Sequence, residues 1–230
     1  MNIGILLSGS GVYDGAEIQE AVLSMLAVSE LGDSYTCIGV NANQFHVINH
    51  ATGEVMNESR NMLVEAARIA RGNIVPIQNI QPADLDALII PGGFGSAKNF
   101  TKWAFEGPDG SILPEVKLLL VNLVNIGKPI AALCVSPVVL AKALEGSSIH
   151  PSLTIGSTAA LSPYDIEAFS QGLEKTGAST TSKTVNEILV DTQNKIVTAP
   201  CYMMEANISD IWKNIRQAVA ELKKLATPSL

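Results

Sequence analysis

The 230-residue chain is 47% hydrophobic, which is enough to fill one sizeable core, and we expect a single domain over residues 1–230. Its 15 Lys and Arg against 22 Asp and Glu give a net charge of −7, which disfavours phosphate-backbone binding as a main role, so we expect no nucleic-acid partner. The three cysteines show no close pairing or C-x-x-C spacing, which excludes a disulfide framework and a zinc site and favours a reduced compartment.

Apolar strands alternate with amphipathic helices along the chain, the pattern of a parallel sheet covered on both faces. In chain order we expect a strand over 2–7, helix 16–31, strand 35–40, helix 58–70, strand 85–90, helix 115–126, strand 129–133, helices 137–144 and 164–175, a hairpin of 187–191 with 196–199, and helix 204–225. Ligands of open α/β sheets bind beyond the carboxyl ends of the strands. We therefore expect one cleft, lined by the segments that follow Leu7, Ile90, Leu133 and Ala199.

No basic leader is apparent in the first residues, and no apolar run approaches the ~20 residues that a membrane span requires. We therefore expect a cytoplasmic protein with no membrane partner. The stretch 41–58 fits neither the helical nor the strand period and is expected to form an inserted loop or ribbon. It contains His46 and His50. For His46, and for His150 further along, solvent exposure or a local hydrogen bond is the better interpretation, whereas His50 is left open because the insert could fold over the site.

Residues 8–15, after the first strand, are rich in glycine, but their G-x-G-x-x-x-G spacing departs from the dinucleotide fingerprint. Nucleotide binding is therefore disfavoured. Glu17 and Glu20 follow, three residues apart, and share one face at the start of a helix. They are either first-turn acids that complement the helix dipole or carboxyl groups that point into the cleft. In the cleft, either one could hydrogen-bond to a sulfur or act as a general acid and base.

A second glycine-rich segment, 91–99, follows the strand over 85–90. Its glycines allow tight turns in which main-chain N–H groups point at a developing oxyanion. The alternative is a plain turn from strand to helix. Taken with a nucleophile and a carboxylate from neighbouring loops, the segment favours a site.

Cys134 is the candidate nucleophile, because an apolar strand leads directly into it and a helix with Pro137 in its first turn follows. At such a corner the helix dipole and unpaired N–H groups favour the thiolate and predict a depressed thiol pKa. The alternative is a buried structural cysteine. Cys37 reads as core, and Cys201, at the carboxyl end of a strand, could line the cleft.

The chain strongly resembles the ElbB/ES-one family, a branch of the PfpI-like, class I glutamine amidotransferase-like superfamily. The resemblance rests on the segments 11–18, 47–54, 91–99 and 194–198, with Pro200 and Tyr202. It implies a flavodoxin-like three-layer α/β sandwich with a mostly parallel central sheet, a nucleophile elbow and a homodimer. Cys134 matches the elbow cysteine, and Glu20 best matches the acidic partner, with Glu17 as the fallback.

The resemblance also implies oxyanion and substrate contacts at Gly92, Gly93, Val135, Asn99 and His50. Val135 stands where amidotransferases and protease-like members carry a histidine, so no base adjoins the nucleophile and a hydrolytic triad is not predicted. Several ElbB-like proteins resemble glutathione-independent glyoxalases.

We therefore expect a glyoxalase III-like lyase that needs no metal or other cofactor and converts small 2-oxoaldehydes, such as methylglyoxal and glyoxal, to 2-hydroxy acids. Cys134 would attack the aldehyde, and Glu20 or Glu17 would move protons through an enediol. The expected partner is then a small carbonyl compound. The alternative is a non-catalytic, redox-responsive or accessory protein associated with isoprenoid pathways, whose reactive cysteine is oxidised.

Overall fold

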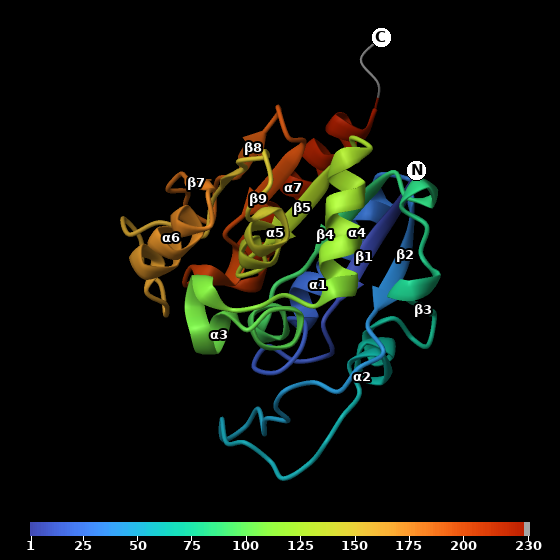
Figure 1. The fold of residues 1–230 in the computed structure, drawn as a ribbon, viewed down its shortest axis with the longest axis vertical. Helices are drawn as coiled ribbons and strands as arrows, with labels where there is room; N and C mark the ends of the chain where they lie inside the picture. The colour runs from blue at the N-terminus through green and yellow to red at the C-terminus, as the bar shows by residue number, and fades with distance from the viewer. Residues whose placement is uncertain (228–230) are drawn as a thin grey trace.

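The computed structural model describes residues 1–227, in which a seven-stranded sheet is covered by helices on both faces (Figure 1). The strands are β1 (Asn2–Leu7), β2 (Ser34–Gly39), β3 (Ile74–Pro76), β4 (Ala87–Ile90), β5 (Ile130–Leu133), β8 (Leu189–Asp191) and β9 (Ile196–Ala199). Their spatial order is β3-β2-β1-β4-β5-β9-β8, and every neighbouring pair is parallel except β8 with β9. The expected α/β fold with a mostly parallel central sheet is confirmed.

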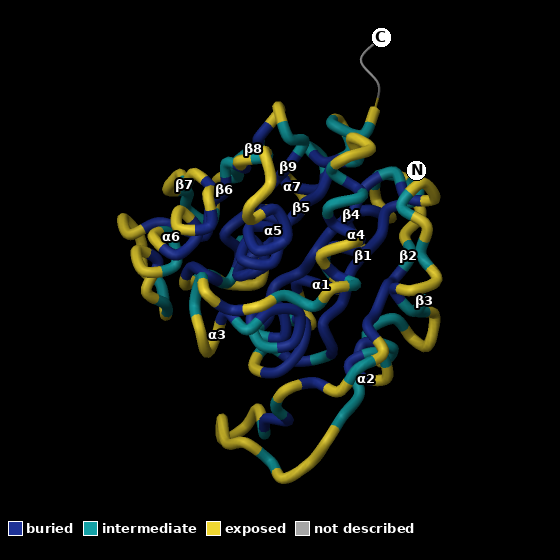
Figure 2. Tube along the Cα trace, viewed as in Figure 1, coloured by how far each residue is buried: buried dark blue, intermediate teal, exposed yellow. Residues whose placement is uncertain are grey.

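The central strands are wholly buried, because helices cover them from both sides. In Figure 1, α4 (Pro114–Asn125) and α5 (Pro137–Leu144) lie in front of the sheet, and α1 (Ile18–Glu30) and α7 (Ile208–Ala226) lie behind it. Every residue of β4 and β5 is buried, as the dark blue centre of Figure 2 shows. Among residues 1–227, no helix combines the length and apolar character needed to cross a membrane.

Helices α1, α7 and α2 (Met62–Ile69) begin two to four residues later than expected, because an N-cap residue precedes each of them. The side chains of Glu17, Asn61 and Asn207 accept hydrogen bonds from N–H groups of the first turns. The other expected elements agree with the structure within two residues. Several short elements were not predicted, because each has too few residues to show a helical or strand periodicity. They are β3, α3 (Trp103–Glu106), and the two-stranded sheet of β6 (Ser152–Leu153) with β7 (Ser179–Thr180) beside α6 (Ile166–Lys175).

Residues 41–61 form a loop that projects from the lower edge of the sheet in Figures 1 and 2 and is largely exposed. Its regular pairing is limited to two isolated antiparallel bridges, Ile48 with Val55 and Asn43 with Asn61. The loop returns to α2 and lies close to the carboxyl ends of the strands, where the polar segments of the chain gather.

Candidate active site

Cys134 occupies the corner between β5 and α5 with a φ of +57°, a left-handed backbone that costs an L-residue about 1–2 kcal/mol. Neighbouring contacts hold this corner. The Cys134 N–H donates to the Ala199 carbonyl at 2.9 Å, and the Ser136 hydroxyl donates to the Pro91 carbonyl at 2.6 Å. The thiol side chain is only 5% exposed. The structure therefore contains the strand, corner and helix that the sequence predicts around this cysteine.

Glu20 is the carboxyl group that contacts the sulfur. Its side chain is fully buried and hydrogen-bonds to Cys134. One carboxyl oxygen accepts the Gly92 N–H at 2.8 Å, and the other accepts the Tyr202 N–H at 3.2 Å. Glu17 has a different position, because it caps α1 by accepting the Glu20 N–H at 2.6 Å and lies in an outer wall. Of the two carboxyl groups that share this helix face, Glu20 is the one that the fold places at the thiol.

Burial dominates the electrostatics of this pair. It raises the pKa of Glu20 to about 8, with a further contribution from the charge of Glu17. Burial also raises the pKa of the Cys134 thiol well above its ordinary value, the Glu20 charge adds to this, and the N–H groups of Gly93 and Val135 oppose it. The predicted depression of the thiol pKa is therefore wrong, because the corner is too deeply buried for these N–H groups to compensate. At neutral pH both groups retain their protons, and the first proton to leave belongs to the pair.

The glycine-rich segment after β4 packs directly on the pair. A Cβ added at Gly92 would lie 2.4 Å from the Cys134 Cβ and 2.5 Å from a Glu20 carboxyl oxygen, so only glycine fits there. The Gly92 N–H is committed to Glu20 and is not free to serve the predicted oxyanion contact. The N–H groups of Gly93 and Val135 face the sulfur instead. Two of the three predicted N–H donors are thus placed at the thiol.

A hollow opens above the sulfur where four strand ends meet. It is lined by Val12, Gly93, Phe94, Cys134, Val135, Tyr164, Tyr202 and Met203. These residues follow β1, β4, β5 and β9, with Tyr164 added from the segment before α6, so the predicted meeting of the four segments is confirmed. An outer hollow shares Val12, Tyr164 and Tyr202 and adds Tyr13, Glu17, Gln19, Pro163, Met204, Glu205 and Ala206. Neither lining includes a histidine.

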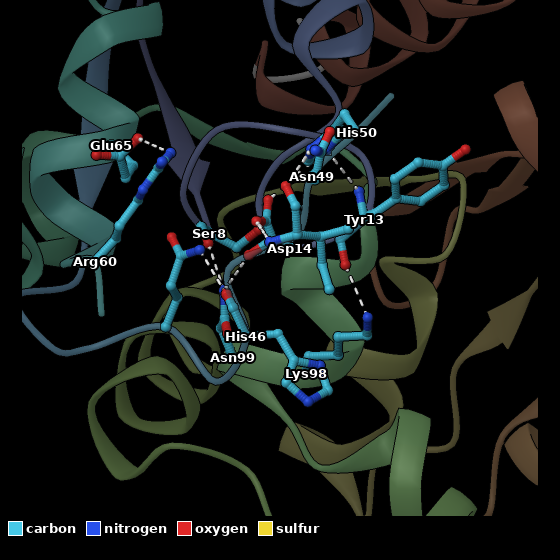
Figure 3. Close-up of polar contacts among 12 residues, drawn as sticks. Ser8, Tyr13, Asp14, His46, Asn49, His50, Arg60, Glu65, Lys98 and Asn99 are labelled. Carbon is cyan, nitrogen blue, oxygen red and sulfur yellow. Dashed lines mark hydrogen bonds and ion pairs between the residues drawn. The ribbon is translucent and has the colours of Figure 1, made fainter. Parts of the chain in front are cut away.

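The Asn99 side chain makes three hydrogen bonds to the main chain, beneath the projecting loop (Figure 3). Its amide donates to the carbonyls of Ser8 at 2.9 Å and Asp14 at 2.8 Å, and its oxygen accepts the Phe45 N–H at 2.8 Å. Asn99 does not line either hollow described above. The structure therefore places this residue as a tie between the loop and the segment after β1, apart from the thiol.

His50 also lies on the projecting loop rather than in the linings. Its Nε2 accepts the Tyr13 N–H at 3.2 Å, and its ring stacks on the Tyr13 ring with centroids 5.0 Å apart (Figure 3). The loop therefore contacts the wall of the outer hollow through Tyr13, and its histidine does not line the inner hollow. His150 bonds to the Gly177 carbonyl at 3.0 Å, the local contact expected for it. Within residues 1–227, no group of three or more His, Cys, Asp or Glu side chains could hold a metal ion.

Tyr164 and Phe94 are wall residues that the sequence did not indicate. Burial raises the pKa of Tyr164 to about 12, so its hydroxyl stays protonated beside the thiol. Tyr164 comes from a segment that was expected to begin a helix, and nothing in its spacing pointed to the cleft. Tyr202 did carry a signal, since it follows the last strand of the sheet within a segment of the resemblance.

No protein-family model matches the chain. The Homo sapiens protein named "Glutamine amidotransferase-like class 1 domain-containing protein 3, mitochondrial" is 38% identical over 227 residues, which cover 97% of this chain and 82% of the relative. The Rattus norvegicus "ES1 protein homolog, mitochondrial" is 37% identical over 227 residues, covering 97% and 83%. Both relatives are named as mitochondrial proteins. This finding contradicts the expectation of a cytoplasmic protein, which rested on cysteine usage and an apparent lack of a leader.

Among solved structures, an isoprenoid biosynthesis protein with an amidotransferase-like domain from Ehrlichia chaffeensis matches with a TM-score of 0.87 and 32% identity, covering 97% of this chain and 99% of that one. Glyoxalase III from Candida albicans matches with a TM-score of 0.59 and 14% identity, covering 96% and 97%. At that identity the second likeness concerns the fold alone.

Proposed function

The chain belongs to the ES1 (ElbB) family of the DJ-1/PfpI superfamily, and from this premise we propose that it is a glutathione-independent glyoxalase-type enzyme. Its substrates would be small 2-oxoaldehydes, and its products the corresponding 2-hydroxy acids. The observation that carries the proposal is the buried carboxyl of Glu20, hydrogen-bonded to the Cys134 thiol beneath a hollow. That the superfamily includes a glyoxalase III of the same fold adds support.

The first step uses the pair as one unit. Loss of one of its two protons leaves a thiolate beside the protonated Glu20, and the thiolate attacks the aldehyde carbon and forms a C–S bond. The carbonyl oxygen becomes the hemithioacetal oxyanion and takes up the Glu20 proton, which leaves the Glu20 carboxylate. The N–H groups of Gly93 and Val135, which already face the sulfur, are placed to stabilise this oxygen.

The second step moves a proton between carbons. The Glu20 carboxylate removes the hydrogen from the former aldehyde carbon as a proton while the neighbouring ketone oxygen takes up a proton, which gives an enediol. Glu20 then returns its proton to the neighbouring carbon, and the hydroxyl on the sulfur-bearing carbon loses its proton as the thioester carbonyl forms. The product is a thioester of the 2-hydroxy acid on Cys134. Water cleaves its C–S bond, which releases the acid and restores the thiol. A carboxyl group with a pKa of about 8 can both accept and donate this proton near neutral pH.

The two adjoining hollows divide a small substrate between them. The inner hollow has a volume of only about 10 Å³, room for about one water-sized group, between the side chains of Val12, Phe94, Tyr164 and Met203. The reacting carbonyl oxygen would enter there, where the neutral Tyr164 hydroxyl can donate to it, and the rest of the substrate would lie in the outer hollow of about 430 Å³. Selection for the net charge of the substrate would take place in the outer hollow, whose lining includes Glu17 and Glu205.

The direct test is lactate formation from methylglyoxal without glutathione. We expect Cys134→Ser and Glu20→Gln to lose activity by about 10²-fold or more, the scale of a removed general acid and base. Glu17→Gln is the matched variant, because it removes the other carboxyl of the same helix face and should retain far more activity than Glu20→Gln. Equal, near-background rates for all four proteins would refute the proposal and favour the non-catalytic alternative.

A further inference from the structure

Cys201 is a buried nucleophile that the proposed chemistry does not use. It follows β9, whereas Cys134 follows β5, and these two strands are parallel neighbours with Leu133 opposite Ala199. Cys134 and Cys201 therefore lie one and two residues beyond the same register pair. Neighbouring strands are about 4.8 Å apart, and disulfides form over Cα separations of about 4.4–6.8 Å. Two cysteines that leave adjacent strands at the same end of the sheet therefore start from a spacing within the range of a disulfide.

The local backbone turns both cysteines out of their strands. Cys201 has a φ of +45° and Cys134 a φ of +57°, and both are left-handed conformations that non-glycine residues seldom adopt. The Cys134 N–H donates to the Ala199 carbonyl at 2.9 Å and also faces the Cys201 sulfur, which therefore lies against the elbow. Cys201 is fixed there, because its own N–H donates to the buried Asn214 side chain at 3.0 Å. Each thiol is thus held beside the other without a change in strand pairing.

We propose that Cys134 and Cys201 form a reversible disulfide when a hydroperoxide oxidises the site. In the first step, the Cys134 thiolate attacks one peroxide oxygen, the O–O bond breaks, and a sulfenic acid and water, or an alcohol, result. In the second step, the Cys201 sulfur attacks the Cys134 sulfur, the S–OH bond breaks, and the hydroxyl leaves with the Cys201 proton as water. The pair loses two electrons and two protons, and the peroxide is reduced.

The disulfide has two consequences for the site. It removes the Cys134 sulfur from the hydrogen bond with Glu20, and so it stops any chemistry that needs the free thiol. It also consumes the sulfenic acid before further peroxide can convert it to the irreversible sulfinic acid. Burial raises the pKa of both thiols, so the reaction is slow at neutral pH and is best followed in mildly alkaline buffer. The inference does not depend on the proposed carbonyl chemistry, because its readout is the mass of the protein.

The experiment treats the full chain with hydrogen peroxide at about pH 8.5, blocks free thiols under denaturing conditions, and measures intact and peptide masses. For the wild type we expect the loss of two hydrogens, one remaining free thiol at Cys37, and a peptide pair joined through Cys134 and Cys201. Dithiothreitol should restore all three thiols. In Cys201→Ser, Cys134 should instead gain two oxygens, and dithiothreitol should not reverse this.

Cys37→Ser is the matched control, since Cys37 lies in β2 away from the elbow and its loss should not alter the linked peptides. Should Cys201→Ser fold poorly, the wild-type peptide map decides alone. The proposal is overturned if oxidised wild type carries a sulfinic acid at Cys134 while Cys201 stays free, or if wild type and Cys201→Ser give the same product at Cys134. An absence of lactate formation would refute only the proposed function and would leave this result standing.

Discussion

The buried carboxyl of Glu20 should make the stability of the fold depend on pH. Its pKa rises from an ordinary 4.5 to about 8 on folding, mainly through burial. Between these two values the folded chain holds a proton that the unfolded chain has released. The folded state is therefore favoured least at high pH: the free energy of unfolding falls as the pH rises from about 4.5 to about 8, and the full penalty applies above 8.

The magnitude follows from the width of this pH window. Each pH unit well inside it is worth about 1.4 kcal/mol, which gives about 5 kcal/mol across the whole window and about 2 kcal/mol between pH 6 and pH 8, because Glu20 is half-titrated at pH 8. Glu20→Gln keeps the shape of the side chain but cannot titrate, so it should lose this contribution. In the variant, the side-chain amide NH₂ of Gln faces one of the two main-chain N–H groups that donate to Glu20 in the wild type. That N–H loses its acceptor, which costs about 1–3 kcal/mol at any pH.

The assay is urea unfolding at pH 6 and pH 8 for wild type and Glu20→Gln. The difference between the two proteins isolates Glu20, because other groups with shifted pKa values, such as Glu17 and His46, are present in both. Cys134→Ala is the control, since burial still raises the pKa of Glu20 in it and the pH dependence should persist. The reasoning is refuted if wild type and Glu20→Gln lose the same stability between pH 6 and pH 8.

Two further substitutions test the packing of the site and of the loop over 41–61. Gly92→Ala should lower the unfolding free energy by about 1–3 kcal/mol and abolish lactate formation, because its Cβ would overlap Cys134 and Glu20; an unchanged melting temperature would contradict this. Asn99→Ala leaves the Phe45 N–H without its acceptor and should make the loop several-fold more sensitive to limited proteolysis while the melting temperature falls; cleavage at the wild-type rate would contradict it.

The elbow was predictable because three local signals agree at one place. An apolar strand, Cys134 and a proline in the first helical turn are all legible in the sequence, and the structure places them as expected. The residues alone could not decide whether Glu17 or Glu20 contacts the sulfur, since side chains three apart share a helix face. It was decided by where the helix begins: Glu17 became the N-cap, and Glu20 was left to point at the sulfur.

Other features of the site depend on burial and on distant segments, which local patterns do not report. The thiol pKa was predicted in the wrong direction, because the helix N-terminus is visible in the sequence and the depth of Cys134 is not. Tyr164 enters the wall from a segment whose spacing gave no sign of it. Asn99 belongs to a motif of the resemblance, yet its hydrogen bonds go to the main chain around the loop.

The measurement that tests the central claim most directly is conversion of methylglyoxal in D2O, followed by proton NMR for wild type and Cys134→Ser. The account predicts lactate that depends on Cys134. Because Glu20 carries the hydrogen between the carbons as a proton, any exchange with solvent during the transfer places deuterium at C2. Lactate formed equally fast by both proteins, or no lactate from either, would contradict the roles given to Cys134 and Glu20.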